Sequence, residues 1–126
     1  MENELIYKDL SYRIIGVLFE VFNELGYGYQ EKYYQLAIAK ALGKNKLKFK
    51  KEESLPIKFQ NEEIGRYYVD FLIEDKIVLE IKKGDKFRKT NIDQVYGYLK
   101  RFNLKLGLLA NFTREGIKIK RIVNIK

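Results

Sequence analysis

Two acidic residues and one lysine interrupt an otherwise apolar stretch of the chain: Asp70, Glu80 and Lys82. The stretch predicts two strands, 67–73 and 77–82, joined by a polar turn, because both segments are rich in β-branched and aromatic residues. Side chains alternate along a strand, so Glu80 and Lys82 share one face, and Asp70 lies opposite them if the hairpin register allows. Two carboxylates beside an ammonium can hold Mg²⁺ or Mn²⁺ and activate a water for hydrolysis.

The Glu-x-Lys pair has a second interpretation, an exposed salt bridge on a sheet surface, which is the commoner situation for such charges. Burial of unpaired charge costs several kcal/mol, so sequences rarely place it among apolar residues without a function. The neighbours of Glu80 and Lys82 are apolar, and Asp70 adds another carboxylate. We therefore favour the functional interpretation and keep the salt bridge as the alternative.

The composition narrows the chemistry that is available to the chain. Its 126 residues include no Cys and no His, which excludes disulfides, thiol nucleophiles, histidine metal sites and Ser–His catalysis. Catalysis must therefore use carboxylates, Lys, Tyr or a metal ion. The net charge of +8 favours a polyanionic partner, with nucleic acid first and an anionic membrane surface second.

The length suits one globular domain, which we expect to cover residues 1–126. No apolar run approaches the roughly 20 residues that span a bilayer. The first residues lack the basic-then-apolar order of an export signal. Together with the absence of Cys, these features lead us to expect a cytoplasmic protein with no membrane partner.

Hydrophobic periodicity places the hairpin between helices and further strands. Apolar residues at three- and four-residue spacing predict three amphipathic helices, the last of them capped by Thr90. Alternating or continuous apolar residues predict four more strands, and Pro56 indicates an edge strand because proline cannot donate to a sheet ladder. The helices are expected at about 8–25, 30–43 and 90–102, and the strands at 47–52, 56–59, 105–110 and 117–125.

Other polar and aromatic residues have two interpretations each. Glu31 lies in the first turn of the second helix, where the helix dipole favours a carboxylate without any chemistry. A cationic loop directly follows Lys82 and can either hold a phosphate backbone or be simply solvated. Several tyrosines can stack on unpaired bases, although packing is their commoner role. The cationic residues are Lys83, Lys86, Arg88 and Lys89, and the tyrosines are Tyr27, Tyr29, Tyr33, Tyr67 and Tyr68.

The order of these motifs resembles the PD-(D/E)XK nuclease superfamily, and more narrowly the group called GxxExxY proteins. The naming motif is present as Gly28-Tyr-Gln-Glu31-Lys-Tyr-Tyr34, followed by Asp70, Glu80-Ile-Lys82, Gln94-Val-Tyr-Gly-Tyr98 and Leu106-Gly-Leu-Leu-Ala-Asn-Phe112. The resemblance covers nearly the whole chain, from about residue 12 to residue 124. It implies an α/β fold with a restriction-endonuclease-like (αβββαβ) core, in which helices flank a central mixed sheet.

The resemblance also implies a role for each matching residue. Asp70 and Glu80 would bind the metal, and Lys82 would orient or deprotonate the attacking water. Glu31 would contribute directly or through a metal-bound water. Gln94 and Tyr98 match a Gln-x-x-x-Tyr element that supports the site and the DNA.

Two positions depart from the family pattern. Phe22 stands where the group often has a histidine, and Val69 stands where the superfamily has the proline of its name. Neither departure removes a metal-binding oxygen, so both leave the expected two-carboxylate-plus-lysine site intact.

The function expected from these features is a Mg²⁺- or Mn²⁺-dependent nuclease that hydrolyses phosphodiester bonds of DNA, with RNA left open. A junction-resolving endonuclease, comparable to Holliday-junction resolvases, is one subtype, and it would act as a homodimer because two scissions need two sites. The alternative function is a non-catalytic nucleic-acid-binding or assembly module that keeps the nuclease fold.

Overall fold

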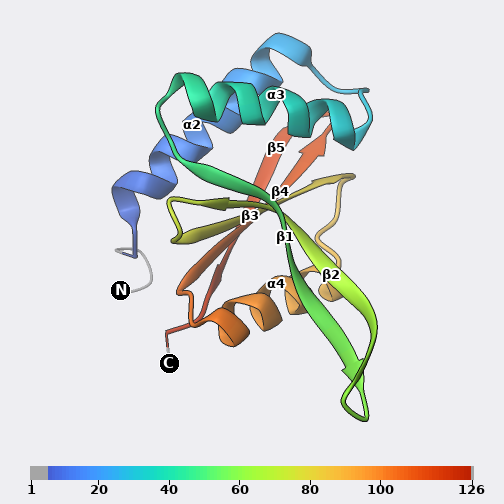
Figure 1. Ribbon diagram of the computed structural model, residues 1–126. Helices are drawn as coiled ribbons and strands as arrows, with labels where there is room; N and C mark the ends of the chain where they lie inside the picture. The colour runs from blue at the N-terminus through green and yellow to red at the C-terminus, as the bar shows by residue number, and fades with distance from the viewer. Residues whose placement is uncertain (1–5, 126) are drawn as a thin grey trace.

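A computed structural model describes residues 6–125. Residues 1–5 and Lys126 lie outside the described range. The expectation about an export signal and the outer limits of the expected domain fall on these residues. Two helices come first, three strands follow, and one helix precedes the last two strands (Figure 1). The elements are α2 (Lys8–Leu25), α3 (Glu31–Lys44), β1 (Phe49–Phe59), β2 (Glu62–Ile73), β3 (Ile77–Lys83), α4 (Lys89–Phe102), β4 (Leu106–Thr113) and β5 (Gly116–Val123).

The strands form one five-stranded sheet in the order β1-β2-β3-β4-β5. The pair β3 and β4 is parallel, with α4 as the crossover between them, and the other neighbours are antiparallel. Every residue of β4 is buried, which is typical of a central strand covered on both faces. The predicted α/β fold with a mixed sheet between helices is therefore confirmed.

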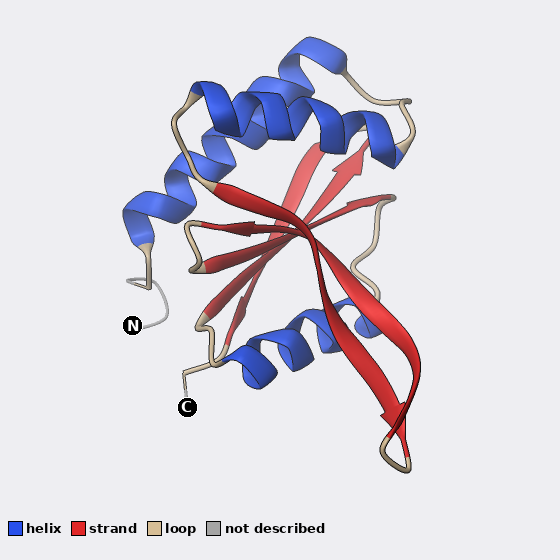
Figure 2. Cartoon of the chain, viewed as in Figure 1, coloured by secondary structure: helices blue, strands red, loops and turns tan. Residues whose placement is uncertain are grey.

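Helices cover both faces of this sheet and create two apolar cores (Figure 2). The larger core lies under α2 and α3 and receives alternate residues of β3, among them Ile77, Leu79 and Ile81. The smaller core lies under α4 and receives Val78 from the other face of β3. Successive side chains of β3 therefore enter opposite cores, as the predicted alternation requires.

Helix α4 approaches the sheet closely at Gly107. A Cβ atom at this position would lie 2.6 Å from Cγ1 of Val95 and 3.6 Å from Cδ1 of Leu99. The 2.6 Å distance to Val95 is below normal van der Waals contact, so only glycine fits here while α4 keeps its position. Gly107 therefore sets the distance between α4 and the central strand.

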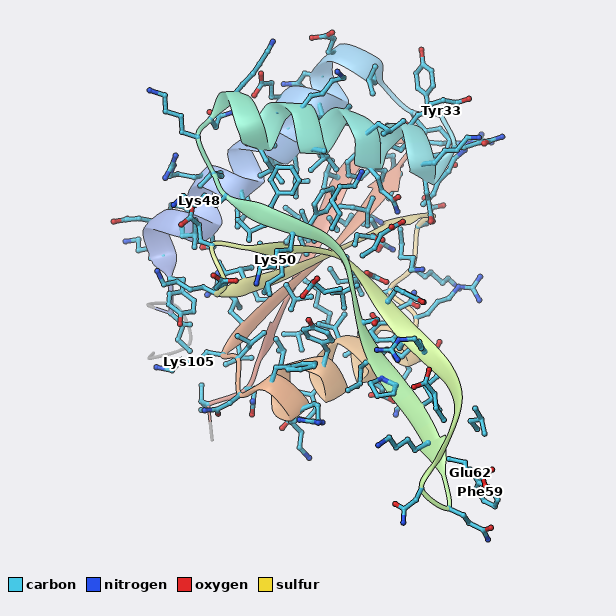
Figure 3. The ribbon with its side chains drawn as sticks, in the orientation of Figure 1. Tyr33, Lys48, Lys50, Phe59, Glu62 and Lys105 are labelled. Carbon is cyan, nitrogen blue, oxygen red and sulfur yellow. The ribbon has the colours of Figure 1, made fainter. Side chains whose placement is uncertain are left out.

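The first two strands extend beyond the rest of the sheet as a two-stranded arm (Figure 1). Phe59 and Glu62 lie at its tip (Figure 3). The two expected strands 47–52 and 56–59 are one continuous strand, and this expectation was wrong because pairing with β2 continues through Pro56. Pro56 does lie on an edge strand, as expected.

The start of α4 also differs from the expectation. Its N-cap residue is Arg88, no side chain caps the helix, and Thr90 already lies inside the first turn. No helix in the described part of the chain is both long and apolar enough to cross a membrane.

Candidate active site

The ladder between β2 and β3 ends where the two candidate metal-binding carboxylates stand. The last Cα pair of the ladder is Phe71 with Leu79. One residue further, side chains replace the main-chain partners: Oδ2 of Asp70 accepts from the N–H of Ile81 at 2.7 Å. Oε1 of Glu80 accepts from the N–H of Asp70 at 3.0 Å. The two strands therefore part here, with both carboxylates held between them.

The remaining carboxylate oxygens have side-chain partners. Oδ1 of Asp70 accepts from Nε2 of Gln35 on α3 at 3.0 Å. Oε2 of Glu80 accepts from the hydroxyl of Tyr67 on β2 at 3.3 Å. Each of the four oxygens thus accepts one hydrogen bond and keeps lone-pair capacity for a further ligand. The site is fixed from α3, β2 and β3 together.

Lys82 supplies a cation at the same place. Its Nζ lies 3.9 Å from Oε2 of Glu80, a distance longer than a hydrogen bond. The Lys82 side chain is 35% exposed, whereas that of Glu80 is 5% exposed. The amine therefore faces both the buried carboxylate and the solvent, and a bound anion can reach it. The exposed salt bridge considered as the alternative does not describe this buried arrangement.

Glu31 lies beside the two carboxylates without joining them. It is the first residue of α3, and its Oε2 accepts from the main-chain N–H of Lys83 at 2.9 Å. Its negative charge contributes to a raised pKa at Asp70. Glu31 thus joins the start of α3 to the end of β3, next to the site.

Burial dominates the electrostatics of the pair. It raises the pKa of Asp70 to about 6, against the N–H of Ile81 and the charge of Lys82, which favour the ionised form. Burial, and then the charge of Asp70, raise the pKa of Glu80 to about 8. Burial first and Glu80 second raise the pKa of Tyr67 above its ordinary value, so its hydroxyl stays protonated and donates. Buried carboxylates with raised pKa values are stabilised in their ionised form when a cation binds between them.

The donor set fits a hard divalent cation. Mg²⁺ prefers oxygen ligands, is bound through one or two carboxylates, and keeps several waters. Asp70 and Glu80 provide the two carboxylates. Within residues 6–125, no group of three or more acidic side chains is close enough to hold a metal together, so Glu31 does not complete a three-carboxylate cage. Waters or a substrate phosphate would fill the other positions.

Among residues 6–125, the hydrogen bonds of Asp70 and Glu80 come from other residues than Gln94 and Tyr98. Gln94 is exposed on α4, one turn before Tyr98 on the same side of the helix. Tyr98 is 3% exposed and packs against Phe102 in the smaller core. Burial, and then the charge of Glu53, raise the pKa of Tyr98 to about 12. The predicted contact of Tyr98 with nucleic acid stays a prediction, and in this structure its ring packs between α4 and the sheet.

The predicted basic loop follows the site directly, and Lys83, Lys86, Arg88 and Lys89 are all exposed. Asn111, buried on the neighbouring β4, fixes this loop: its Nδ2 donates to the carbonyls of Gly84 and Lys86 at 3.3 and 2.7 Å. Lys89 forms an ion pair with Asp93 at 2.7 Å.

Three residues of this region were not assigned to the site from the sequence. Gln35 holds Asp70, Tyr67 holds Glu80, and Asn111 holds the basic loop. For Gln35 a signal existed, because it follows Glu31 by four residues and shares its helix face. Tyr67 was considered for base stacking or for packing, and not as a partner of Glu80.

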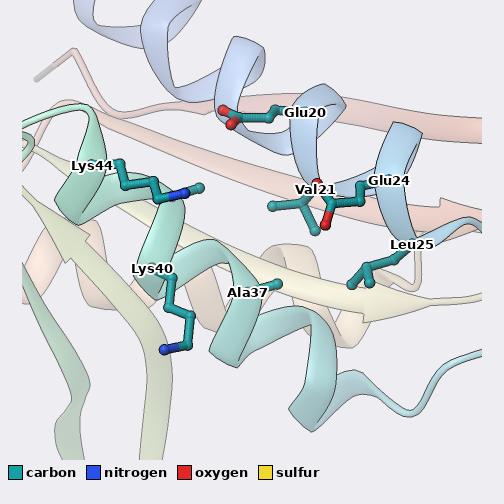
Figure 4. Close-up of a pocket in the computed structure, with 8 residues that line it drawn as sticks. Glu20, Val21, Glu24, Leu25, Ala37, Lys40 and Lys44 are labelled. Atoms are coloured by element: carbon teal, nitrogen blue, oxygen red, sulfur yellow. The ribbon is translucent and has the colours of Figure 1, made fainter.

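A cavity lies away from these residues, between α2 and α3 (Figure 4). It holds about 180 Å³ and is lined by apolar residues together with Glu20, Glu24, Lys40 and Lys44. Acidic and basic side chains are balanced there, and none of the site residues above lines it. At the carboxylates, Asp70 is half-buried and the side chain of Lys82 is 35% exposed, so solvent reaches this region.

Comparison with known proteins identifies the family. The model of the PD-(D/E)XK nuclease superfamily matches residues 8–122. The chain belongs to this superfamily. Asp70 and the Glu80-Ile-Lys82 segment of the superfamily member are the residues that converge in its structure. Superfamily members are typically metal-dependent, in agreement with the donor set.

A search of solved structures finds a chain described as "Crystal structure of SSO0001". It is 17% identical, with 91% of this chain and 77% of that chain covered, and the TM-score is 0.47. Among curated proteins, none matches the chain.

Proposed function

We propose that this superfamily member hydrolyses phosphodiester bonds of DNA with Mg²⁺ or Mn²⁺ as cofactor. The observation that supports the proposal best is the meeting of Asp70, Glu80 and Lys82 where β2 and β3 part. Two carboxylates and one partly exposed ammonium stand together in a chain with net charge +8. A phosphodiester presents the complementary charge.

The bound cation would lower the pKa of a water and neutralise charge on the phosphate. The residues of the chain would position the cation, the attacking water and the phosphate. The N–H groups of Asp70 and Ile81, together with Gln35, hold the two carboxylates in fixed orientations toward the cation position. The Lys82 ammonium is placed to orient the attacking water and to stabilise the negative charge that develops on the phosphate. Preorganised charge of this kind loses little free energy to reorganisation during the reaction.

The exposed cations after Lys82 would hold the DNA. Lys83, Lys86, Arg88 and Lys89 can contact phosphates without reading base sequence. Asn111 would keep their loop beside the site through its two hydrogen bonds to the loop carbonyls. Glu31 would act through its hydrogen bond with the N–H of Lys83, or by binding a water of the cation.

The decisive experiment compares variants for cleavage of plasmid, branched and single-stranded DNA in Mg²⁺, Mn²⁺ or EDTA. Asp70→Asn, Glu80→Gln and Lys82→Met should each lower cleavage by about 10²-fold or more, since each removes a group at the reacting phosphate. Asp75→Asn is the matched control, because Asp75 is an exposed acid in the turn of the same hairpin. Failure of the wild type to cleave any of these DNAs with either metal would falsify the proposal.

The finer assignments are also proposals. The GxxExxY motif supports membership of that group, and two of its residues have defined contacts. Glu31 accepts from the N–H of Lys83, and the hydroxyl of Tyr34 donates to the carbonyl of Gly26 in the loop before α3. A junction-resolving endonuclease of the cytoplasm would require a homodimer. Sedimentation equilibrium and cleavage of a four-way junction test these two points together.

The competing function is a non-catalytic module that binds nucleic acid. It predicts DNA binding that weakens with salt and that is unchanged by Glu80→Gln or Lys82→Met. Calorimetric titration with Mn²⁺ separates the two proposals, because an intact carboxylate pair binds the ion and Asp70→Asn abolishes the heat.

A further inference from the structure

A group of tyrosines and cations lies beside the carboxylate site, and of its members only Lys83 has a part in the function proposed above. Tyr27 and Tyr29 belong to the α2–α3 loop, and Tyr33 lies on the first turn of α3, where that helix adjoins the loop (Figure 3). Their exposed fractions are 38%, 46% and 47%. Large aromatic side chains are commonly buried, so three exposed rings within seven residues are unusual.

The rings are held rather than free. Tyr29 and Tyr33 meet edge to face with centroids 6.4 Å apart, and Tyr29 also meets the buried Tyr34 at 6.1 Å. Tyr34 anchors the loop, because its hydroxyl donates to the carbonyl of Gly26 and accepts from the N–H of Tyr29. We call Tyr27, Tyr29 and Tyr33 the tyrosine platform. These contacts preorganise it, which lowers the entropic cost of binding a ligand.

Cations surround the same rings. Nζ of Lys83 lies 5.1 Å from the centroid of Tyr27, and the guanidinium carbon of Arg114 lies 5.9 Å from it. Nζ of Lys32 lies 5.2 Å from the centroid of Tyr33. These distances are within the range of cation–π attraction, so Tyr27 keeps two positive charges next to the exposed rings.

Lys83 connects this platform to the carboxylates. Its main-chain N–H binds Glu31, its side chain reaches Tyr27, and it directly follows Lys82 along β3. One turn after Glu31 on α3, Gln35 binds Asp70. A nucleotide next to the scissile phosphate would therefore meet the platform.

We propose that Tyr29 and Tyr33, with Tyr27, Lys83 and Arg114, bind unpaired nucleotides of single-stranded DNA. This inference rests on the proposed nuclease function and specifies its substrate class. Aromatic side chains stack on exposed bases whatever the base, and adjacent cations hold the phosphates between them. The bases of a duplex are already stacked on each other, so the same rings gain little from double-stranded DNA. The substrate is thus DNA with a single-stranded segment beside the cleaved bond.

The test is binding of a fluorescein-labelled 20-nucleotide single strand and of a blunt duplex, measured by anisotropy in EDTA so that no cleavage occurs. Tyr29→Leu and Tyr33→Leu should each weaken single-strand binding about tenfold and duplex binding less than about twofold. Tyr29→Phe and Tyr33→Phe should keep wild-type binding, because stacking needs the ring and not the hydroxyl. Tyr12→Leu is the matched control, an exposed tyrosine on α2.

The contribution of the cationic side chains is measured by the salt dependence of single-strand binding. Arg114→Met should lower the salt dependence of single-strand binding by about one phosphate contact. Lys105→Met, an exposed lysine that Figure 3 places far from Tyr33, should leave it unchanged.

Equal losses for single strand and duplex in the leucine variants, or no loss in either, would overturn the platform. Circular dichroism of Tyr33→Leu confirms that the variant is folded. Because binding is measured without metal, the platform can fail while metal-dependent cleavage persists. Conversely, the preference for single strands can hold in a chain that never cleaves.

Discussion

The main-chain N–H of Asp70 donates to Oε1 of Glu80 at 3.0 Å, in the place where the ladder between β2 and β3 would otherwise continue. The acid side chains therefore substitute for sheet hydrogen bonds, and the hairpin opens at the site. This substitution has an energetic consequence, because it holds two acids close together in a buried position. The first two predictions follow from it.

Without metal, we expect the protein to lose stability as the pH rises from about 4 to 8. The pKa of Asp70 is raised to about 6 and that of Glu80 to about 8, above their ordinary values near 4. Between these limits the folded state holds more protons than the unfolded state, so the free energy of unfolding falls with pH. Urea unfolding in EDTA at several pH values measures this slope.

Glu80→Gln should remove much of the slope and raise the free energy of unfolding at pH 8 by about 1–3 kcal/mol. The amide oxygen can still accept from the N–H of Asp70, and the amide nitrogen can donate to the hydroxyl of Tyr67. Asp75→Asn, in the exposed turn, should change neither. An unchanged slope in Glu80→Gln would contradict the electrostatic account of the site.

Mg²⁺ or Mn²⁺ should reverse this loss. A cation that binds the folded state alone stabilises it by RT ln(1 + [L]/Kd), or about 2.7 kcal/mol at one hundred times the Kd. Thermal unfolding at pH 8 with and without the metal should show a rise in Tm for the wild type. Asp70→Asn should remove that rise, whereas Asp75→Asn should keep it. The same Tm shift in Asp70→Asn as in the wild type would place the cation elsewhere.

The packing of α4 on the sheet gives the third prediction. Gly107→Ala should destabilise the protein by about 1–3 kcal/mol, because the added Cβ would lie 2.6 Å from Cγ1 of Val95. Val95→Ala in the same chain should relieve part of the clash. Urea unfolding measures both effects.

Gly43→Ala is the matched control for this prediction. Gly43 lies in α3, and a Cβ there would meet nothing within 4 Å. This variant should be neutral or stabilised by up to about 1 kcal/mol, as expected for alanine in a helix. A loss comparable to that of Gly107→Ala would show that glycine is needed at these positions for a reason other than close packing.

The sequence predicted local structure better than it predicted the extent of the strands. All three helices and β3 were predicted to within one residue, because apolar periodicity and turn residues are local signals. Strand β2 begins at Glu62, earlier than the predicted start at residue 67. Strand β1 was predicted as two pieces, since Ser54-Leu-Pro56 resembles a break, yet its pairing with β2 depends on a partner distant in the sequence. Such pairing cannot be read from one segment alone.

The site shows the same division. The convergence of Asp70 and Glu80 was inferred from hairpin register, which the alternation of residues nearly determines. The hydrogen bond from Gln35 to Asp70 depends on how α3 crosses the sheet, and no local sequence pattern specifies that crossing. The burial of Tyr98 likewise depends on how α4 packs on the sheet, with its close approach at Gly107, and no local pattern specifies that packing.

The fourth prediction separates the glutamine that the structure places at the site from the one that the family pattern suggests. Gln35→Leu should lower cleavage or Mn²⁺ affinity by about 10- to 100-fold, since Gln35 orients Oδ1 of Asp70 and loss of such outer-sphere support has effects of that size. Gln94→Leu tests the residue expected from the Gln-x-x-x-Tyr element, which is exposed on α4. Steady-state cleavage and Mn²⁺ calorimetry of both variants should show the larger loss in Gln35→Leu. A larger loss in Gln94→Leu would contradict this assignment, because it would show that the exposed glutamine of α4, and not the one bonded to Asp70, supports the reaction.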